Sequence, residues 1–152
     1  MTKLVFYIGI FIALISTAVA QQYEYKVVTS VESIVPMGLG RSRIIMNNEN
    51  IDYKDFTTSR VNGKDSNQGN VKRSDAKIDN MDETKLLNFY SGVGINFQNI
   101  ASNDAIIGSK LSAMSAEGWE LVFVVSGVES DAGKDDKNGI FITRYIFRKP
   151  IK

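Results

Sequence analysis

The amino-acid sequence predicts an α+β fold, in which a mostly antiparallel sheet carries one main helix packed on one face. Three observations lead to this prediction. Residues 23–31 alternate with a period of two, residues 103–117 repeat apolar side chains at helical spacing, and two apolar strands follow at 119–125 and 140–147. Strands stand before and after a single helix, and no strand–helix unit is repeated. An inserted hairpin and a mobile loop complete the predicted architecture.

The first half of the chain predicts one clear strand and one hairpin. In YEYKVVTSV (23–31), aromatic and β-branched residues occupy every second position, which is typical of a half-buried strand. Residues 41–46 (RSRIIM) then predict a short strand and residues 47–50 a turn rich in Asn. Residues 51–58 are predicted to return as the other arm of the hairpin.

Residues 60–83 differ in composition from the segments on either side. They contain four large apolar residues in 24 positions, with no period, and their five basic and five acidic residues cancel. Such a segment offers too little apolar surface to offset the entropy of ordering it. We therefore expect residues 60–83 to be a disordered insertion in one domain that spans residues 21–152.

The second half of the chain predicts the helix and the strand that follows it. Residues 85–100 are predicted to form two short extended pieces. Asn103 is the predicted N-cap of the helix, and Gly118 is the predicted left-handed residue after its end. The helix presents an apolar stripe at spacings of four and three, made by Ile107, Leu111 and Met114.

The strand at 119–125 (WELVFVV) begins directly after this helix and is predicted to pair with residues 140–147. Simple alternation places Trp119, Leu121, Phe123 and Val125 on one face. Trp119 follows Gly118, so its ring is expected to pack on the helix stripe at Ile107 and Leu111. The sequence thus predicts four structural residues at the junction of helix and sheet: Ile107, Leu111, Gly118 and Trp119.

Residues 1–20 have the three parts of a secretory signal peptide in the required order. Lys3 is followed by an apolar run over 4–15, and Ala18-Val19-Ala20 is a small-residue cleavage pattern. The apolar run is shorter than the roughly 20 residues that a membrane-spanning helix needs. We expect cleavage after Ala20, no stable membrane insertion afterwards, and a periplasmic or extracellular protein.

Composition excludes several classes of function. The chain contains no His and no Cys, so a Ser-His-Asp triad, a cysteine nucleophile, a thiolate zinc site and a disulfide are all impossible. The whole chain has 18 Lys plus Arg against 17 Asp plus Glu, and Lys3 is the only charge within 1–20. The mature chain is therefore neutral, which argues against binding nucleic acid through a cationic surface.

One candidate metal site lies in the polar connection at 126–139. It offers oxygen ligands of the kind that calcium prefers, although their spacing does not fit an EF-hand loop, and Lys134 and Lys137 dilute the negative charge. A solvated loop without a cofactor is therefore the favoured interpretation, with calcium as the alternative. The candidate ligands are Asp131, Asp135, Asp136 and Asn138.

One candidate anion site lies at residues 38–43, GLGRSR. Backbone amides beside glycine, together with the guanidinium groups of Arg41 and Arg43, could hold an anion. The segment lacks the ending of a phosphate-binding P-loop. A turn entering a strand is the simpler interpretation.

An aromatic set on the predicted strands could stack sugars or bases. With one helix available to cover one sheet face, we expect these rings to lie in the core instead. The apolar character of both faces of 119–125 leaves open whether the insertion or another subunit covers the second face. The set comprises Tyr23, Tyr25, Phe123, Tyr145 and Phe147.

Three stretches resemble a known family of small bacterial domains. They are YEYKVV at 23–28, the AEGWELV junction at 116–122 and YIFRKP at 145–150. Together they resemble the family called domain of unknown function 4177, in a secreted version similar to envelope proteins of the Bacteroidetes type. The matching part covers about half of the mature chain, because residues 33–100 are additional. The resemblance implies the fold, and it brings neither an activity nor site residues.

Three functional hypotheses follow. The leading one is an exported, non-catalytic module with a binding or structural role, whose partner is an envelope protein or a glycan. The second is a small hydrolase of envelope glycans that works with carboxylates alone. The third is a self-assembling envelope protein that forms a homo-oligomer through an exposed sheet face.

Overall fold

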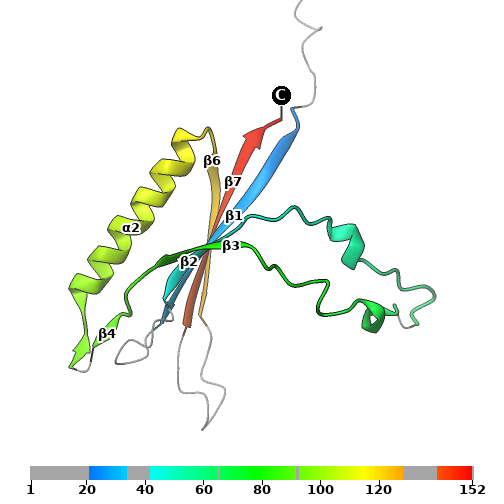
Figure 1. Ribbon diagram of the computed structural model, residues 1–152, viewed down its shortest axis with the longest axis horizontal. Helices are drawn as coiled ribbons and strands as arrows, with labels where there is room; N and C mark the ends of the chain where they lie inside the picture. The colour runs from blue at the N-terminus through cyan, green and yellow to red at the C-terminus, as the bar shows by residue number, and fades with distance from the viewer. Residues whose placement is uncertain (1–20, 34–41, 65, 92, 129–139, 152) are drawn as a thin grey trace, which may run out of the picture.

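The computed structural model describes residues 21–33, 42–64, 66–91, 93–128 and 140–151, and the predicted signal peptide lies outside these ranges. Within them, five antiparallel strands form one sheet in the order β3-β2-β1-β7-β6, and helix α2 (Phe97–Ala116) lies on one side of it (Figure 1). This arrangement confirms the α+β class with one main helix. The strands are β1 (Tyr23–Ser33), β2 (Arg43–Asn47), β3 (Met81–Lys85), β6 (Glu120–Val128) and β7 (Ile140–Pro150).

The centre of the sheet is a long antiparallel pair of β1 and β7. The two strands pair over all 11 residues of each, from Tyr23 opposite Pro150 to Ser33 opposite Ile140. Their alternating aromatic and β-branched residues fit a pleated surface. The predicted pairing of the last two strands is also present, because β6 pairs antiparallel with β7. Among the described residues, no helix has the length and apolar character needed to cross a membrane.

The predicted hairpin over 41–58 is wrong in its second arm. Residues 51–58 form no strand. Instead the Asp52 carboxylate accepts a hydrogen bond from the backbone N–H of Lys54 (3.0 Å) and caps the 3-10 turn η1 (Tyr53–Phe56). β2 pairs with β1 on one side and, on the other, with β3, which comes more than thirty positions later in the chain. An ion pair from Arg43 Nη1 to Glu83 Oε1 (2.6 Å) joins these two strands.

Residues 48–80, which we call the excursion, connect β2 to β3 and extend away from the sheet on the side opposite α2 (Figure 1). The described part contains η1 and a second 3-10 turn, η2 (Gln68–Asn70). The C-terminal boundary of the predicted insertion at 60–83 is therefore too late in the chain, because Met81–Glu83 belong to β3. Its predicted disorder stays a prediction.

The base of the excursion is closed by hydrogen bonds between its two ends. The Asn48 backbone N–H donates to the Asn80 carbonyl oxygen (3.3 Å). Glu49 Oε1 accepts from the backbone N–H groups of Asp79 (3.1 Å) and Asn80 (2.6 Å). The two ends therefore leave and rejoin the sheet side by side.

Helix α2 begins earlier than the sequence predicts. A small hairpin of β4 (Tyr90–Ser91) and β5 (Gly94–Ile95) precedes Asn96, whose side chain accepts from the backbone N–H of Asn99 (3.1 Å) and is the N-cap. The predicted N-cap, Asn103, lies inside the helix and is fully buried. The apolar stripe misled the prediction because it begins only after Asn103.

The end of the helix determines where Trp119 lies. Gly118 has a φ of +87°. The Gly118 N–H donates to the Ser115 carbonyl (2.9 Å), and the Trp119 N–H donates to the Met114 carbonyl (3.0 Å). These two bonds form a Schellman motif, which satisfies the last carbonyls and turns the chain back. Trp119 is thereby directed onto the sheet.

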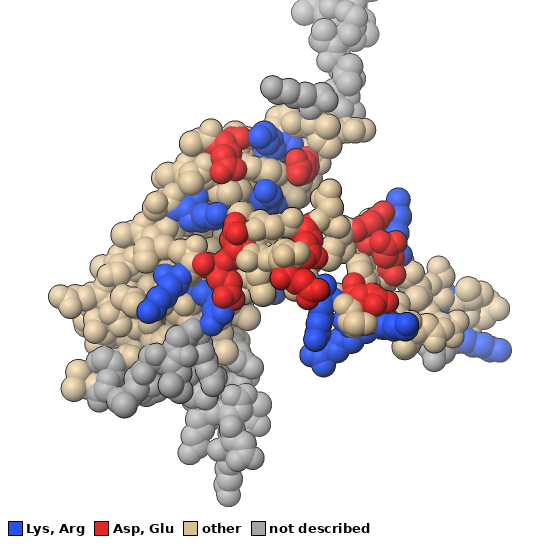
Figure 2. All heavy atoms as spheres, in the orientation of Figure 1, with Lys and Arg blue, Asp and Glu red and all other residues tan. Residues whose placement is uncertain are grey.

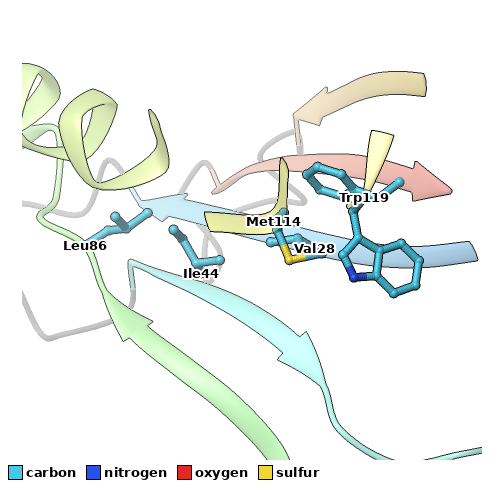
Figure 3. Close-up of a cluster of buried hydrophobic side chains, with 6 residues drawn as sticks. Val28, Ile44, Leu86, Met114 and Trp119 are labelled. Carbon is cyan, nitrogen blue, oxygen red and sulfur yellow. The ribbon is translucent and has the colours of Figure 1, made fainter. Parts of the chain in front are cut away.

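The core lies between α2 and the sheet face that α2 covers (Figure 3). Apolar side chains from the strands, the helix and the segment before it meet there, and Ile106, Ile107 and Leu111 pack against them. This burial is the main favourable term in the stability of the domain. The buried cluster consists of Val28, Ile44, Leu86, Met114, Trp119 and Phe147.

A β-bulge in β6 overturns the predicted alternation of that strand. Leu121 lies opposite the buried Phe147, but the register then shifts by one residue, so that Phe123 lies opposite Ile146. Directly opposed residues of an antiparallel pair point to the same face. Phe123 and Val125 therefore lie on the face away from α2, and not beside Trp119 as simple alternation predicts.

Candidate interaction surface

The sheet face opposite α2, which we call the open face, is apolar and exposed. Its central row runs across three strands, from Val27 on β1 through Ile146 on β7 to Phe123 on β6. Tyr25 is 60% exposed, Phe123 65% and Val125 57%. No described element covers these side chains.

Charged groups border this apolar row at both sides. Toward one end, Arg148 Nε donates to Glu120 Oε2 (2.7 Å), and the Arg148 guanidinium lies 4.5 Å from the centre of the Tyr23 ring. The hydrogen bond from Arg148 lowers the pKa of the Glu120 carboxyl. Toward the other side, Arg144 lies in register between Thr29 and Val125. The open face therefore has an apolar centre and a charged rim.

The aromatic set predicted for the core is divided between the two faces. Phe147 is buried and Tyr145 packs against the core, whereas Tyr25 and Phe123 are exposed on the open face. The prediction that all these rings lie in the core is wrong. For Phe123 the cause is the bulge, which no residue pattern in 119–125 reveals.

A buried polar network lies at the other side of the sheet, where the segment after β3 passes under α2. Asn103 Nδ2 donates to the Leu87 carbonyl (2.7 Å) and to Glu32 Oε1 (2.9 Å), and Asn103 Oδ1 accepts from the Leu87 N–H (2.8 Å). Nearby, the Ser42 hydroxyl donates to Asn88 Oδ1 (2.7 Å). These bonds satisfy backbone groups that would otherwise be buried without partners. The sequence gives no signal for this network beyond the polar residue types.

Glu32 is the half-buried carboxyl of this network. Burial raises its pKa, the hydrogen bond from Asn103 opposes that rise, and the negative charge of Asp104 adds to it. The Glu120 carboxylate is bound to Arg148, and the backbone carbonyl of Glu117 accepts a hydrogen bond from Lys149 Nζ (2.8 Å). Within the described ranges, no three His, Cys, Asp or Glu side chains are grouped to hold a metal ion.

The predicted anion site is only partly within the described residues. Arg41 lies outside them. Arg43 forms its ion pair with Glu83 and borders a shallow surface hollow of about 200 Å³, which Ser42, Glu83 and Lys85 also line. All four candidate calcium ligands lie outside the described residues: Asp131, Asp135, Asp136 and Asn138.

The four predicted structural residues meet at the junction of helix and sheet. Trp119 is buried, and Ile107 and Leu111 pack against its cluster. Lys26 Nζ lies 4.9 Å and Lys149 Nζ 5.6 Å from the centre of the Trp119 ring, close enough for cation–π attraction. Gly118 makes the turn described above.

Comparison of the chain with family models gave no match, and comparisons with curated proteins and with solved structures gave none either.

Proposed function

We propose that this protein is an exported, non-catalytic module that binds another protein through its open face. The observation that carries the proposal is the contiguous apolar row of exposed Val27, half-buried Ile146 and exposed Phe123, extended by exposed Tyr25 and Val125. Large apolar patches are uncommon on soluble monomers and mark interaction sites when polar residues border them. The salt-bridged Arg148 and Glu120 and the exposed Arg144 provide that border.

The chemistry of the open face favours a protein over a glycan. Its centre combines aliphatic Val27, Val125 and Ile146 with the rings of Tyr25 and Phe123. A buried apolar core with a charged rim is the usual anatomy of a protein–protein interface. A sugar site needs polar side chains that reach its hydroxyl groups among the rings, and the central row offers none.

Two features of the sequence support the remaining parts of the proposal. The signal pattern at 1–20 supports export. The absence of His and Cys removes cysteine nucleophiles and histidine bases. Glu32, the carboxyl whose pKa burial raises, accepts a hydrogen bond from Asn103 and belongs to a network that positions the segment before α2. We therefore do not extend the proposal to a hydrolase.

Photo-crosslinking in the producing cell tests the proposal. A photoreactive amino acid replaces Tyr25 on the open face, and the matched control carries it at Ala105, an exposed position of α2. We expect a discrete protein adduct from position 25 and none from position 105. Equal labelling at both positions, or adducts with cell-wall glycan alone, would contradict a protein partner.

A charge at the centre of the open face provides the second arm of this test. Val27→Asp is expected to abolish the adduct from position 25 while leaving the thermal unfolding midpoint close to that of wild type, because Val27 is already 44% exposed. An adduct that survives Val27→Asp would show that the contact does not use the apolar row.

A further inference from the structure

β6 lies at one edge of the sheet that the described residues form. Within the described residues it pairs with β7 on one side and with no strand on the other. Its residues 121–128 (LVFVVSGV) carry no charge and no proline. Phe123 and Val125 are exposed on the open face, and Val124 and Val128 are exposed on the other face. An edge strand of this kind is a template for pairing with another chain.

The opposite edge of the same sheet shows how an edge is normally protected. β3 is short, with the sequence MDETK, and carries Asp82, Glu83 and Lys85. Figure 2 shows acidic and basic side chains interspersed over the region of β3 and the excursion. Charges on an edge oppose pairing because they would have to be desolvated between strands. The contrast singles out β6 as the edge available for pairing.

We propose that β6 pairs antiparallel with β6 of a second copy of this chain, so that two five-stranded sheets become one sheet of ten strands. The inference goes beyond the proposed function, because the second copy pairs along the β6 edge and leaves the open face accessible to another protein. A second copy fits because the segment 121–128 is uncharged, so pairing it with itself brings no like charges together. Pairing of β6 with β3 of another copy would instead meet Asp82 and Glu83 and would not close.

The symmetry of this pairing determines the shape of the dimer. Two antiparallel edge strands are related by a two-fold axis perpendicular to the sheet. Both copies of α2 therefore lie on one side, and the two open faces join into one continuous surface, in which each Arg144 lies next to Val125 near the axis. With Val125 on the axis, Phe123 of one copy lies opposite Gly127 of the other, where the glycine leaves room for the ring.

The mass of the protein in solution tests the pairing directly. The chain has a mass of 16.9 kDa before any processing. Light scattering on the protein as the cell exports it is expected to give twice the mass of one chain. Val125→Lys is expected to give the mass of one chain with an unchanged circular dichroism spectrum. The control Thr84→Lys, on the β3 edge, is expected to stay dimeric.

Cysteine crosslinking tests the strand and its register. The chain has no Cys, so each single substitution introduces the only thiol. Single cysteines at positions 123–127 are compared under mild oxidation, with Thr84→Cys as the control. Residues opposed across an antiparallel pair come within disulfide range, so the position on the axis, expected at 125, should form the most covalent dimer.

Several outcomes would overturn the inference. A protein that has the mass of one chain throughout its soluble range has no β6 pairing. A dimer that survives Val125→Lys and forms no disulfide from 123–127 uses a different surface. If position 25 still captures another protein while the chain is monomeric, the proposed function stands and the β6 inference fails. If the chain is dimeric but position 25 captures nothing, the β6 inference stands and the proposed function fails.

Discussion

Val27 and Val28 are neighbours on β1, yet Val27 is 44% exposed and Val28 is 1% exposed. The same contrast separates Phe147, which is 1% exposed, from Phe123, which is 65% exposed. The two members of each pair have the same side chain and lie on opposite faces of the sheet. The difference teaches that α2, and not residue type, decides which face becomes the core. The open face is apolar enough to form a second core once another surface covers it.

The largest expected effect is a difference in stability between a variant of Trp119, on the covered face, and a variant of Phe123, on the open face. Trp119→Ala is expected to lower the free energy of unfolding by about 3–5 kcal/mol, the usual cost of removing a buried large aromatic ring. Phe123→Ala is expected to change it by about 0.5 kcal/mol or less in the monomer, as for other surface substitutions. Denaturant unfolding followed by circular dichroism measures both. Similar losses from the two variants would mean that the open face is also covered.

Trp119 is the only tryptophan, so its fluorescence provides an independent check. Its emission is expected to be blue-shifted in the native protein and to move to longer wavelength on unfolding. Phe123→Ala should leave the native emission unchanged. A solvent-like native spectrum would contradict the burial of the ring.

A smaller effect is expected from the polar part of the covered face. Asn103→Ala removes three hydrogen bonds and leaves the N–H and carbonyl of Leu87 without their partner. We expect a loss of about 1–3 kcal/mol, typical of leaving a buried polar group unsatisfied. Gln98→Ala, an exposed position on the same helix, is the control. Equal denaturation midpoints for the two variants would show that the network contributes nothing to stability.

The smallest expected effect is a pH dependence at Glu32. Because its folded pKa is raised, the folded state binds the proton more readily than the unfolded state. The stability that protonated Glu32 contributes to the folded state is therefore fully present below the pKa of the unfolded state. It is lost as pH rises through the pKa of the folded state. Glu32→Gln keeps the acceptor for Asn103 without the charge. At neutral pH the variant should have a higher melting temperature than wild type. This difference in melting temperature should shrink as pH falls through the raised pKa of Glu32.

Asp104→Asn sharpens the test of Glu32, because the Asp104 charge adds to the rise in the pKa of Glu32. At neutral pH this variant should raise the melting temperature, as Glu32→Gln does, but by a smaller amount. A melting difference between wild type and Glu32→Gln that does not vary with pH would contradict the raised pKa.

Much of the covered face could be predicted from local patterns. The alternation with a period of two over 23–31 predicts β1, and the apolar runs after Gly118 predict the pair of β6 and β7. Each of these signals lies within one continuous segment and is produced by burial on one or both faces. The end of α2 was also predictable, because only glycine readily adopts the positive φ found at Gly118.

The features that define the open face and the sheet edge could not be predicted in this way. β3 has an exposed side chain at every position, so its sequence shows no alternation of apolar and polar residues that would indicate a strand. Its pairing with β2 depends on contacts across the excursion, such as the ion pair of Arg43 with Glu83. The bulge at Leu121 and Phe123 depends on the register of β6 against β7, which no single-strand pattern contains.

The closed base of the excursion has a consequence for protein engineering and for the evolution of the chain. Its two ends are fixed beside each other by Asn48, Glu49 and Asn80, so the residues between them form a loop whose closure is already secured. Doubling the length of such a loop costs only about 0.6 kcal/mol. Peptide epitopes, affinity tags or whole small domains can therefore be inserted near residue 73, or the segment 51–78 replaced by a short linker, without disturbing the sheet. The excursion is therefore a suitable position for displaying inserted peptides on this fold.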